Sequence, residues 1–147
     1  MIKIAIAMNT DHSFYHNNPY TASKFAVYTI IKNQDKVKYS LSAIFENPWL
    51  SQMSKAFEYD EINCSCSHIC KSSLEHTCSH YAMLDVIGGC NYFLADHYCD
   101  NTKKALQNAG VTIFKIPPII NKVDIAIKNF LLGAMYASTV QHIHNAS

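Results

Sequence analysis

Cysteine and histidine are the side chains of this sequence with the clearest capacity for chemistry. The chain contains six Cys and eight His among its 147 residues. Half of these fourteen side chains fall in one short stretch: Cys64, Cys66, His68, Cys70, His76, Cys78 and His80. An even distribution would place only about two of them in a window of that length. Such a concentration is typical of a metal-binding or redox-active segment.

The cysteines of this stretch have the donor chemistry of a metal site. Cys64, Cys66 and Cys70 follow a C-x-C-x3-C spacing, and Cys78 comes eight residues after Cys70. Thiolates bind zinc and iron–sulfur clusters because soft sulfur matches these metals. The pattern over residues 59–78 is neither that of a strand nor that of a helix, so a loop is expected there. We predict that Cys64, Cys66, Cys70 and Cys78 bind the metal.

Other uses of the same stretch remain open. His76 and His80 are four residues apart and would form a chelating pair if a helix already covered them. A helix that begins near Cys78 instead places that thiol at a helix N-terminus, where a thiolate is favoured. If the helix begins there, Cys78 is the favoured ligand, although His68, His76 or His80 could replace one cysteine ligand. A reversible disulfide and a purely apolar role are further alternatives.

A second group of candidate residues lies in two loops that follow predicted strands. Cys99 precedes a helix for which Asp100 is the expected N-cap, so backbone amides there could favour an anionic metal–sulfide cluster. We predict that His97, Cys99, His12 and His16 help to bind this cofactor. The alternatives are that Cys99 packs at the end of a strand and that the three histidines are ordinary loop residues.

Composition excludes several classes of function. The formal net charge is +1, and all twelve basic residues are Lys, so neither a nucleic-acid footprint nor an arginine fork for phosphate is present. No apolar run is long enough to cross a bilayer. The N-terminus does not have the pattern of a secretory signal, so we expect a protein of the reducing cytoplasm. Nucleic acid and membrane are therefore not expected partners.

The elements that must position these residues alternate between strands and helices. Apolar runs predict strands over 3–8, 24–31, 38–45, 91–96 and 111–116. Helices are expected after Asn47-Pro48, before Gly88-Gly89, from Asp100 to Ala109 and over about 121–135. We expect a single domain over residues 1–135, with the Cys/His-rich insertion at about 59–78 and a polar tail at 136–147.

The order of these elements predicts an α/β fold. A hairpin should join the second and third strands, and helical crossovers should make the fourth and fifth strands parallel. We expect a mixed five-stranded sheet, with the first strand beside the fourth and helices on both faces. Ligands of such sheets bind beyond the carboxyl ends of the strands. The loops that carry His12, His16, His97 and Cys99 should meet at that edge, together with the cysteine-rich loop that follows the third strand.

The chain resembles the dinitrogenase iron–molybdenum cofactor biosynthesis family, which contains NifX-like proteins and the C-terminal domain of NifB. The resemblance covers about residues 2–132 and depends on three motifs: residues 3–7 (Lys-Ile-Ala-Ile-Ala), 46–48 (Glu-Asn-Pro) and 105–111 (Ala-Leu-Gln-Asn-Ala-Gly-Val). It implies a ribonuclease H-like three-layer domain. It also implies that the protein binds or carries a metal–sulfur cluster without catalysing a reaction.

Together, these observations predict non-catalytic binding, storage or delivery of an iron–sulfur or molybdenum/iron–sulfur cluster in metallocofactor assembly. The expected partners are cluster-assembly or acceptor proteins. Two alternatives use the same side chains. The first is a zinc-binding structural or sensory module, and the second is a thiol-dependent enzyme in which Cys99 acts with His97.

Overall fold

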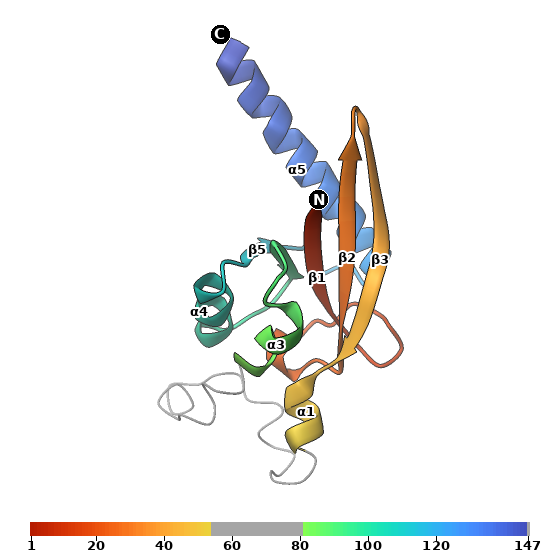
Figure 1. Ribbon diagram of the computed structural model, residues 1–147, viewed down its shortest axis with the longest axis vertical. Coiled ribbons are helices and arrows are strands. Elements are labelled where there is room, and N and C mark those ends of the chain that lie inside the picture. Colours follow the sequence, from red (N-terminus) through yellow and green to blue (C-terminus); the bar gives the residue numbers. More distant parts are fainter. Residues whose placement is uncertain (54–80, 147) are drawn as a thin grey trace.

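The protein folds around a mixed five-stranded sheet, with helices on both of its faces (Figure 1). The computed structural model describes residues 1–53 and 81–146, and it describes side chains over 1–50 and 81–134. Within these residues the order of the strands across the sheet is β3-β2-β1-β4-β5. The predicted α/β class and mixed sheet are confirmed, whereas the ribonuclease H-like assignment stays a prediction.

Three strands form the antiparallel part of the sheet. Strand β1 (Ile2–Met8) pairs with β2 (Lys24–Asn33), which in turn pairs with β3 (Lys36–Glu46). The turn between β2 and β3 is only two residues long, and Gln34 adopts a positive φ of 57° there. The predicted hairpin is therefore confirmed, with longer strands and a tighter turn than the sequence indicated.

The parallel part of the sheet contains β4 (Tyr92–Ala95) and β5 (Thr112–Lys115). Strand β4 lies between β1 and β5 and runs parallel to both. The predicted parallel pairing of the fourth and fifth strands and the predicted place of the first strand beside the fourth are confirmed. Because β1 and β4 run in the same direction, the loops that follow them leave the sheet at the same edge. The fold thus brings the loop after Met8 close to the turn after Ala95.

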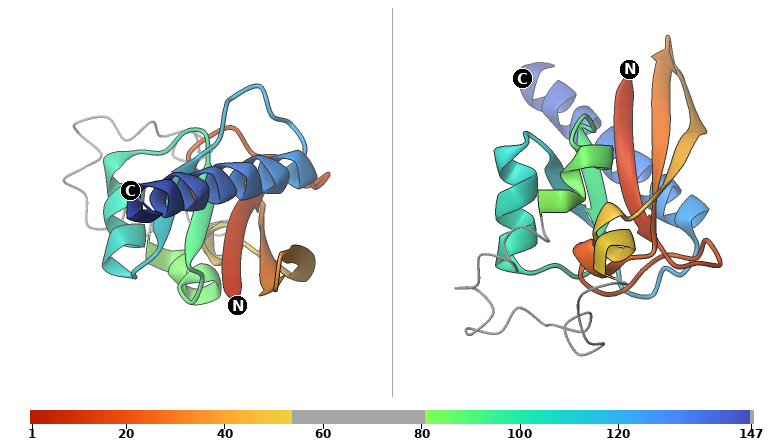
Figure 2. Two further views of the ribbon diagram at one scale, coloured as in Figure 1. Left: turned by 90° about the horizontal axis from the view of Figure 1, so that it is seen from above. Right: turned by 60° about the horizontal axis from the view of Figure 1, so that its bottom comes forward.

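Helices cover the two faces of the sheet unequally. Helices α3 (Leu84–Ile87) and α4 (Asp100–Asn108) pack on one face, in a cluster that we call the first core. Helix α5 (Val123–Ala146) packs on the other face, in the second core. The two further views show the sheet between these layers (Figure 2). Alternation along β1 explains the division, because Ala5 and Ala7 face the first core whereas Ile4 and Ile6 face the second.

Capping residues determine where two of the helices begin. The predicted Asn-Pro start is confirmed, since the Trp49 amide donates to Asn47 Oδ1 (3.0 Å) and helix α1 (Pro48–Met53) begins at the proline. The expectation that Asp100 is the N-cap of α4 is wrong. Cys99 is the N-cap of α4, because its backbone is still extended and its sulfur accepts a hydrogen bond from the Thr102 amide.

Helix α5 is longer than the helix predicted over about 121–135. It continues to Ala146, through most of the segment 136–147 that was predicted to be a polar tail. Its buried residues, Val123, Ala126, Ile127 and Phe130, follow the spacing of one helical face. The last part of α5 projects past the sheet (Figure 1). Within the described residues, no helix is long and apolar enough to span a membrane.

Candidate functional site

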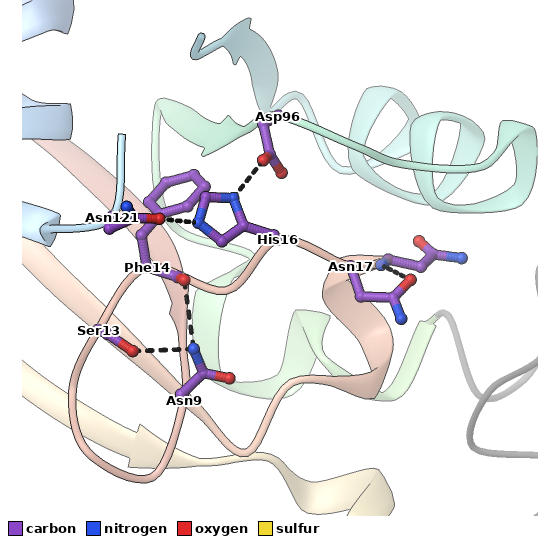
Figure 3. Close-up of polar contacts among 8 residues, drawn as sticks. Asn9, Ser13, Phe14, His16, Asn17, Asp96 and Asn121 are labelled. Carbon is purple, nitrogen blue, oxygen red and sulfur yellow. Dashed lines mark hydrogen bonds and ion pairs between the residues drawn. The ribbon is translucent and has the colours of Figure 1, made fainter. Parts of the chain in front are cut away.

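Three segments meet around His16 at the carboxyl-end edge of the sheet (Figure 3). His16 belongs to the loop after β1, Asp96 directly follows β4, and Asn121 precedes α5. The His16 Nδ1 lies 2.5 Å from Asp96 Oδ2, and its Nε2 lies 2.7 Å from Asn121 Oδ1. The imidazole therefore bridges two loops that are separated from it by 80 and 105 residues of sequence.

The electrostatics of this bridge favour a protonated His16. Both contacts of the ring are to oxygen atoms, so both ring nitrogens donate when the imidazole is charged. The hydrogen bond to Asp96 raises the pKa of His16 above its usual value, and the contact with Asn121 acts in the same direction. The Asp96 side chain is only 4% exposed, whereas that of His16 is 37% exposed. A buried acidic side chain thus contacts a partly exposed imidazole whose pKa is raised.

The rest of the loop after β1 is held by its own polar contacts. The Asn9 side-chain amide donates to Ser13 Oγ (2.9 Å) and to the Phe14 carbonyl (3.2 Å). Residue His12 takes a positive φ of 68° and its side chain is exposed. Phe14 is buried in the second core and anchors the loop two residues before His16. The loop therefore presents His12 to solvent and turns His16 inward, toward Asp96.

A second polar network joins the same loop to the start of α4. The Thr102 hydroxyl donates to Asn18 Oδ1 (2.7 Å), and both side chains are buried. Cys99 Sγ lies 3.4 Å from both the amide nitrogen and the hydroxyl oxygen of Thr102. The only hydroxyl proton of Thr102 is donated to Asn18 Oδ1. The Cys99 thiol is therefore the donor in its contact with Thr102 Oγ1. This arrangement suits a neutral thiol and connects the loop, the turn and the helix.

The structure brings only part of the predicted site together. His16 and Cys99 both make contacts where the loop after β1 meets the turn after β4. The side chains of His12 and His97 are exposed, and His16 is exposed as well but contacts Asp96 and Asn121. Cys64, Cys66, Cys70 and Cys78 lie outside the described residues, as do His68, His76 and His80. Within the described residues, no three His, Cys, Asp or Glu side chains lie close enough together to hold a metal ion.

Sequence reasoning missed several residues that organise this edge. Asn121 and Thr102 were not identified, and Asp96 was not identified as the partner of His16. A polar residue in a loop gives no local sign that it will be buried against a loop far away in sequence. The one available signal was the position of Asp96 directly after an apolar strand, where functional loop residues are common.

Comparisons with known proteins agree with the fold. No family model matches the chain, and no curated protein matches it. One similar solved structure is the NMR structure of a Thermotoga protein described as NifB-related and as a member of the DUF35 family. It is 20% identical in sequence, the alignment covers 90% of each chain, and the TM-score is 0.51. At this identity the similarity shows a shared fold. The resemblance to the NifX-like and NifB family therefore stays a prediction.

Proposed function

We propose that this protein binds a metal–sulfur cluster through Cys64, Cys66, Cys70 and Cys78 and stores or delivers it without catalysing a reaction. The cluster would be of the iron–sulfur or molybdenum/iron–sulfur type, and the partners would be cluster-assembly or acceptor proteins. The donor chemistry carries the proposal, since four thiols within fifteen residues match the ligand preference of such clusters. The NifB-related description of the Thermotoga protein points in the same direction.

The arrangement of the described residues supports this role for the cysteine-rich segment. Helix α1 precedes the segment, and its Trp49 packs against the first core. Helix α3 follows the segment, and Ile87 is buried in the same core. Cys99 also packs against this core. The described helices that flank the segment in sequence therefore pack on the face of the sheet that carries Cys99, the remaining candidate thiol ligand outside the segment.

Metal analysis of protein purified without oxygen tests the proposal. We expect visible absorbance together with iron and acid-labile sulfide, with or without molybdenum. The double variant Cys66→Ser/Cys70→Ser should lose the absorbance and the metal. The matched control is Cys90→Ala, because Cys90 is buried in the first core and burial raises the pKa of its thiol. Equal metal content in the double variant and the wild type would refute the ligand assignment.

The same preparation separates the two alternatives. A colourless protein with one zinc ion per chain, lost in the double variant, would indicate a zinc module instead of a cluster carrier. A metal-free protein in which Cys99 alone reacts rapidly with iodoacetamide would indicate a thiol-dependent enzyme. The variant Cys99→Ser, analysed in parallel, shows whether this thiol belongs to the metal ligands or only caps α4.

A further inference from the structure

We propose that a groove between α4 and the outer edge of β5 binds an extended, acidic peptide segment of a partner protein as an additional strand. A cavity of about 300 Å³ lies in this groove. One wall is formed by Tyr98, Lys103 and Gln107, and the other by Val111, Thr112 and Ile113. None of these residues belongs to the proposed metal ligands, so the two sites can be tested separately.

The contacts of α4 show which way the groove faces. Asn108 Nδ2 donates to Tyr81 Oη (2.9 Å), so this flank of the helix faces the residues that lead into α3. Lys103 and Gln107 are four residues apart and lie on the opposite flank, with the buried Leu106 between the two flanks. The flank that carries Lys103 therefore faces outward, beyond β5, and leaves the groove open to solvent.

The second wall offers backbone groups for strand addition. Strand β5 is the last strand of the sheet within the part of the chain that the structure describes. The Thr112 and Ile116 amides donate to β4-side carbonyls at 3.0 and 2.9 Å. Ile113 and Lys115 alternate with them, so their N–H and C=O groups point away from β4. Repeated backbone groups along an edge match another backbone better than they match a small molecule.

Charge identifies the partner as acidic. Together, α4 and β5 carry three lysines and one aspartate. Lys103 and Lys115 are exposed, the first lining the groove and the second at the end of β5. A second copy of this chain is a poorer occupant, because it would bring the same exposed lysine to this edge and no added acidic groups from β5. Glutamate or aspartate at alternate positions of an added strand would instead pair with these lysines.

Selection from a library of random linear peptides tests the docking site. We expect enriched peptides with acidic residues at alternate positions. A synthetic peptide of the enriched sequence should shift the amide signals of Ile113 and Lys115 and slow their hydrogen exchange. The variant Lys103→Glu should weaken binding by about fivefold or more, because one exposed ion pair becomes a repulsion. The control Lys32→Glu lies on β2, away from the groove, and should bind normally.

Two further measurements identify what the groove recognises. Methylating alternate backbone nitrogens of the peptide keeps its side chains but removes its donors, so this change should abolish binding if a strand is added. Failure to enrich any peptide, or equal binding by the methylated peptide, would overturn the proposal. Competition by inorganic phosphate or free glutamate, with the same amide shifts, would assign the groove to small anions instead.

Discussion

His16 shows how one side chain can hold an edge of the sheet together. Its two ring nitrogens contact Asp96 and Asn121, so a single residue joins the loop after β1 to the turn after β4 and to the start of α5. These loops also carry His12, His97 and Cys99. The bridge thus holds together the loops that carry these candidate residues, while both ring nitrogens of His16 are used within the protein.

The bridge should make stability depend on pH. The pKa of His16 is raised in the folded protein, so its contribution is complete below the unfolded value of about 6.5 and is lost as the pH rises through the folded pKa. Urea unfolding should show a smaller loss of stability between acidic and alkaline pH for His16→Gln than for the wild type. The exposed His97, changed to Gln, is the control and should keep the wild-type slope.

The buried hydroxyl of Thr102 should matter for stability as well. Thr102→Val keeps the shape of the side chain but removes the donor to Asn18 Oδ1, which is buried beside it. We expect a loss of about 1–3 kcal/mol, the usual cost of leaving a buried polar group without its partner. Urea unfolding measures this loss. The same substitution at the exposed Thr112 should change stability by much less, and a neutral Thr102→Val would contradict the role of the network.

At the scale of elements, the close contact between α5 and β5 depends on a residue without a side chain. A Cβ added at Gly133 would lie 2.8 Å from Phe114 Cζ. The Phe114 ring cannot easily move aside, because it makes an edge-on contact with Phe130 at a centroid distance of 5.0 Å. Glycine at this position thus lets the helix lie against the edge strand.

Gly133→Ala should therefore destabilise the protein despite its better helix propensity. Alanine favours a helix interior by about 1 kcal/mol, whereas overpacking costs about 1–3 kcal/mol. We expect a net loss of about 1 kcal/mol in thermal or urea unfolding. The smaller side chain of Phe114→Leu should relieve the clash, so Gly133→Ala should be neutral or stabilising in that background. Stabilisation by Gly133→Ala alone would show that a Cβ at position 133 does not clash with Phe114.

At the scale of the whole molecule, both cores join distant parts of the chain. The first core contains Phe25 together with Phe93 and Leu106, and the second contains Ile4 together with Leu94 and Ile127. Each core therefore connects the N-terminal strands directly to β4 and to a helix later in the chain. The described residues supply two substantial apolar layers without help from a bound metal.

The fold should survive removal of the proposed metal. After treatment with a chelator, or in Cys66→Ser/Cys70→Ser, we expect cooperative unfolding with an unchanged dependence on urea concentration, since the area exposed on unfolding stays nearly the same. Circular dichroism follows the transition. A chain that unfolds when the metal is removed would show that the cysteine-rich segment organises the fold, as in small zinc domains.

The sequence by itself determined the local elements and the class of fold. Alternating apolar runs, the Asn47-Pro48 start and the glycines after Ile87 and Ala109 are local signals, so the strands and several helix boundaries could be predicted from neighbouring residues. The cap of α4 and the end of α5 could not. The order of the elements then restricted the sheet to few topologies. The concentration of cysteines over 64–78 was also visible locally, and the metal site inferred from it stays a prediction.

Only the tertiary structure decided which side chains meet. His16 contacts Asp96 and Asn121, and Thr102 contacts Asn18, across 80 or more residues of sequence. No local pattern encodes such a contact, because it depends on which loops leave the same edge of the sheet and how closely they approach. The start of α4 at a Cys99 cap was likewise decided by backbone geometry, since Cys99 and Asp100 are both compatible with the sequence pattern.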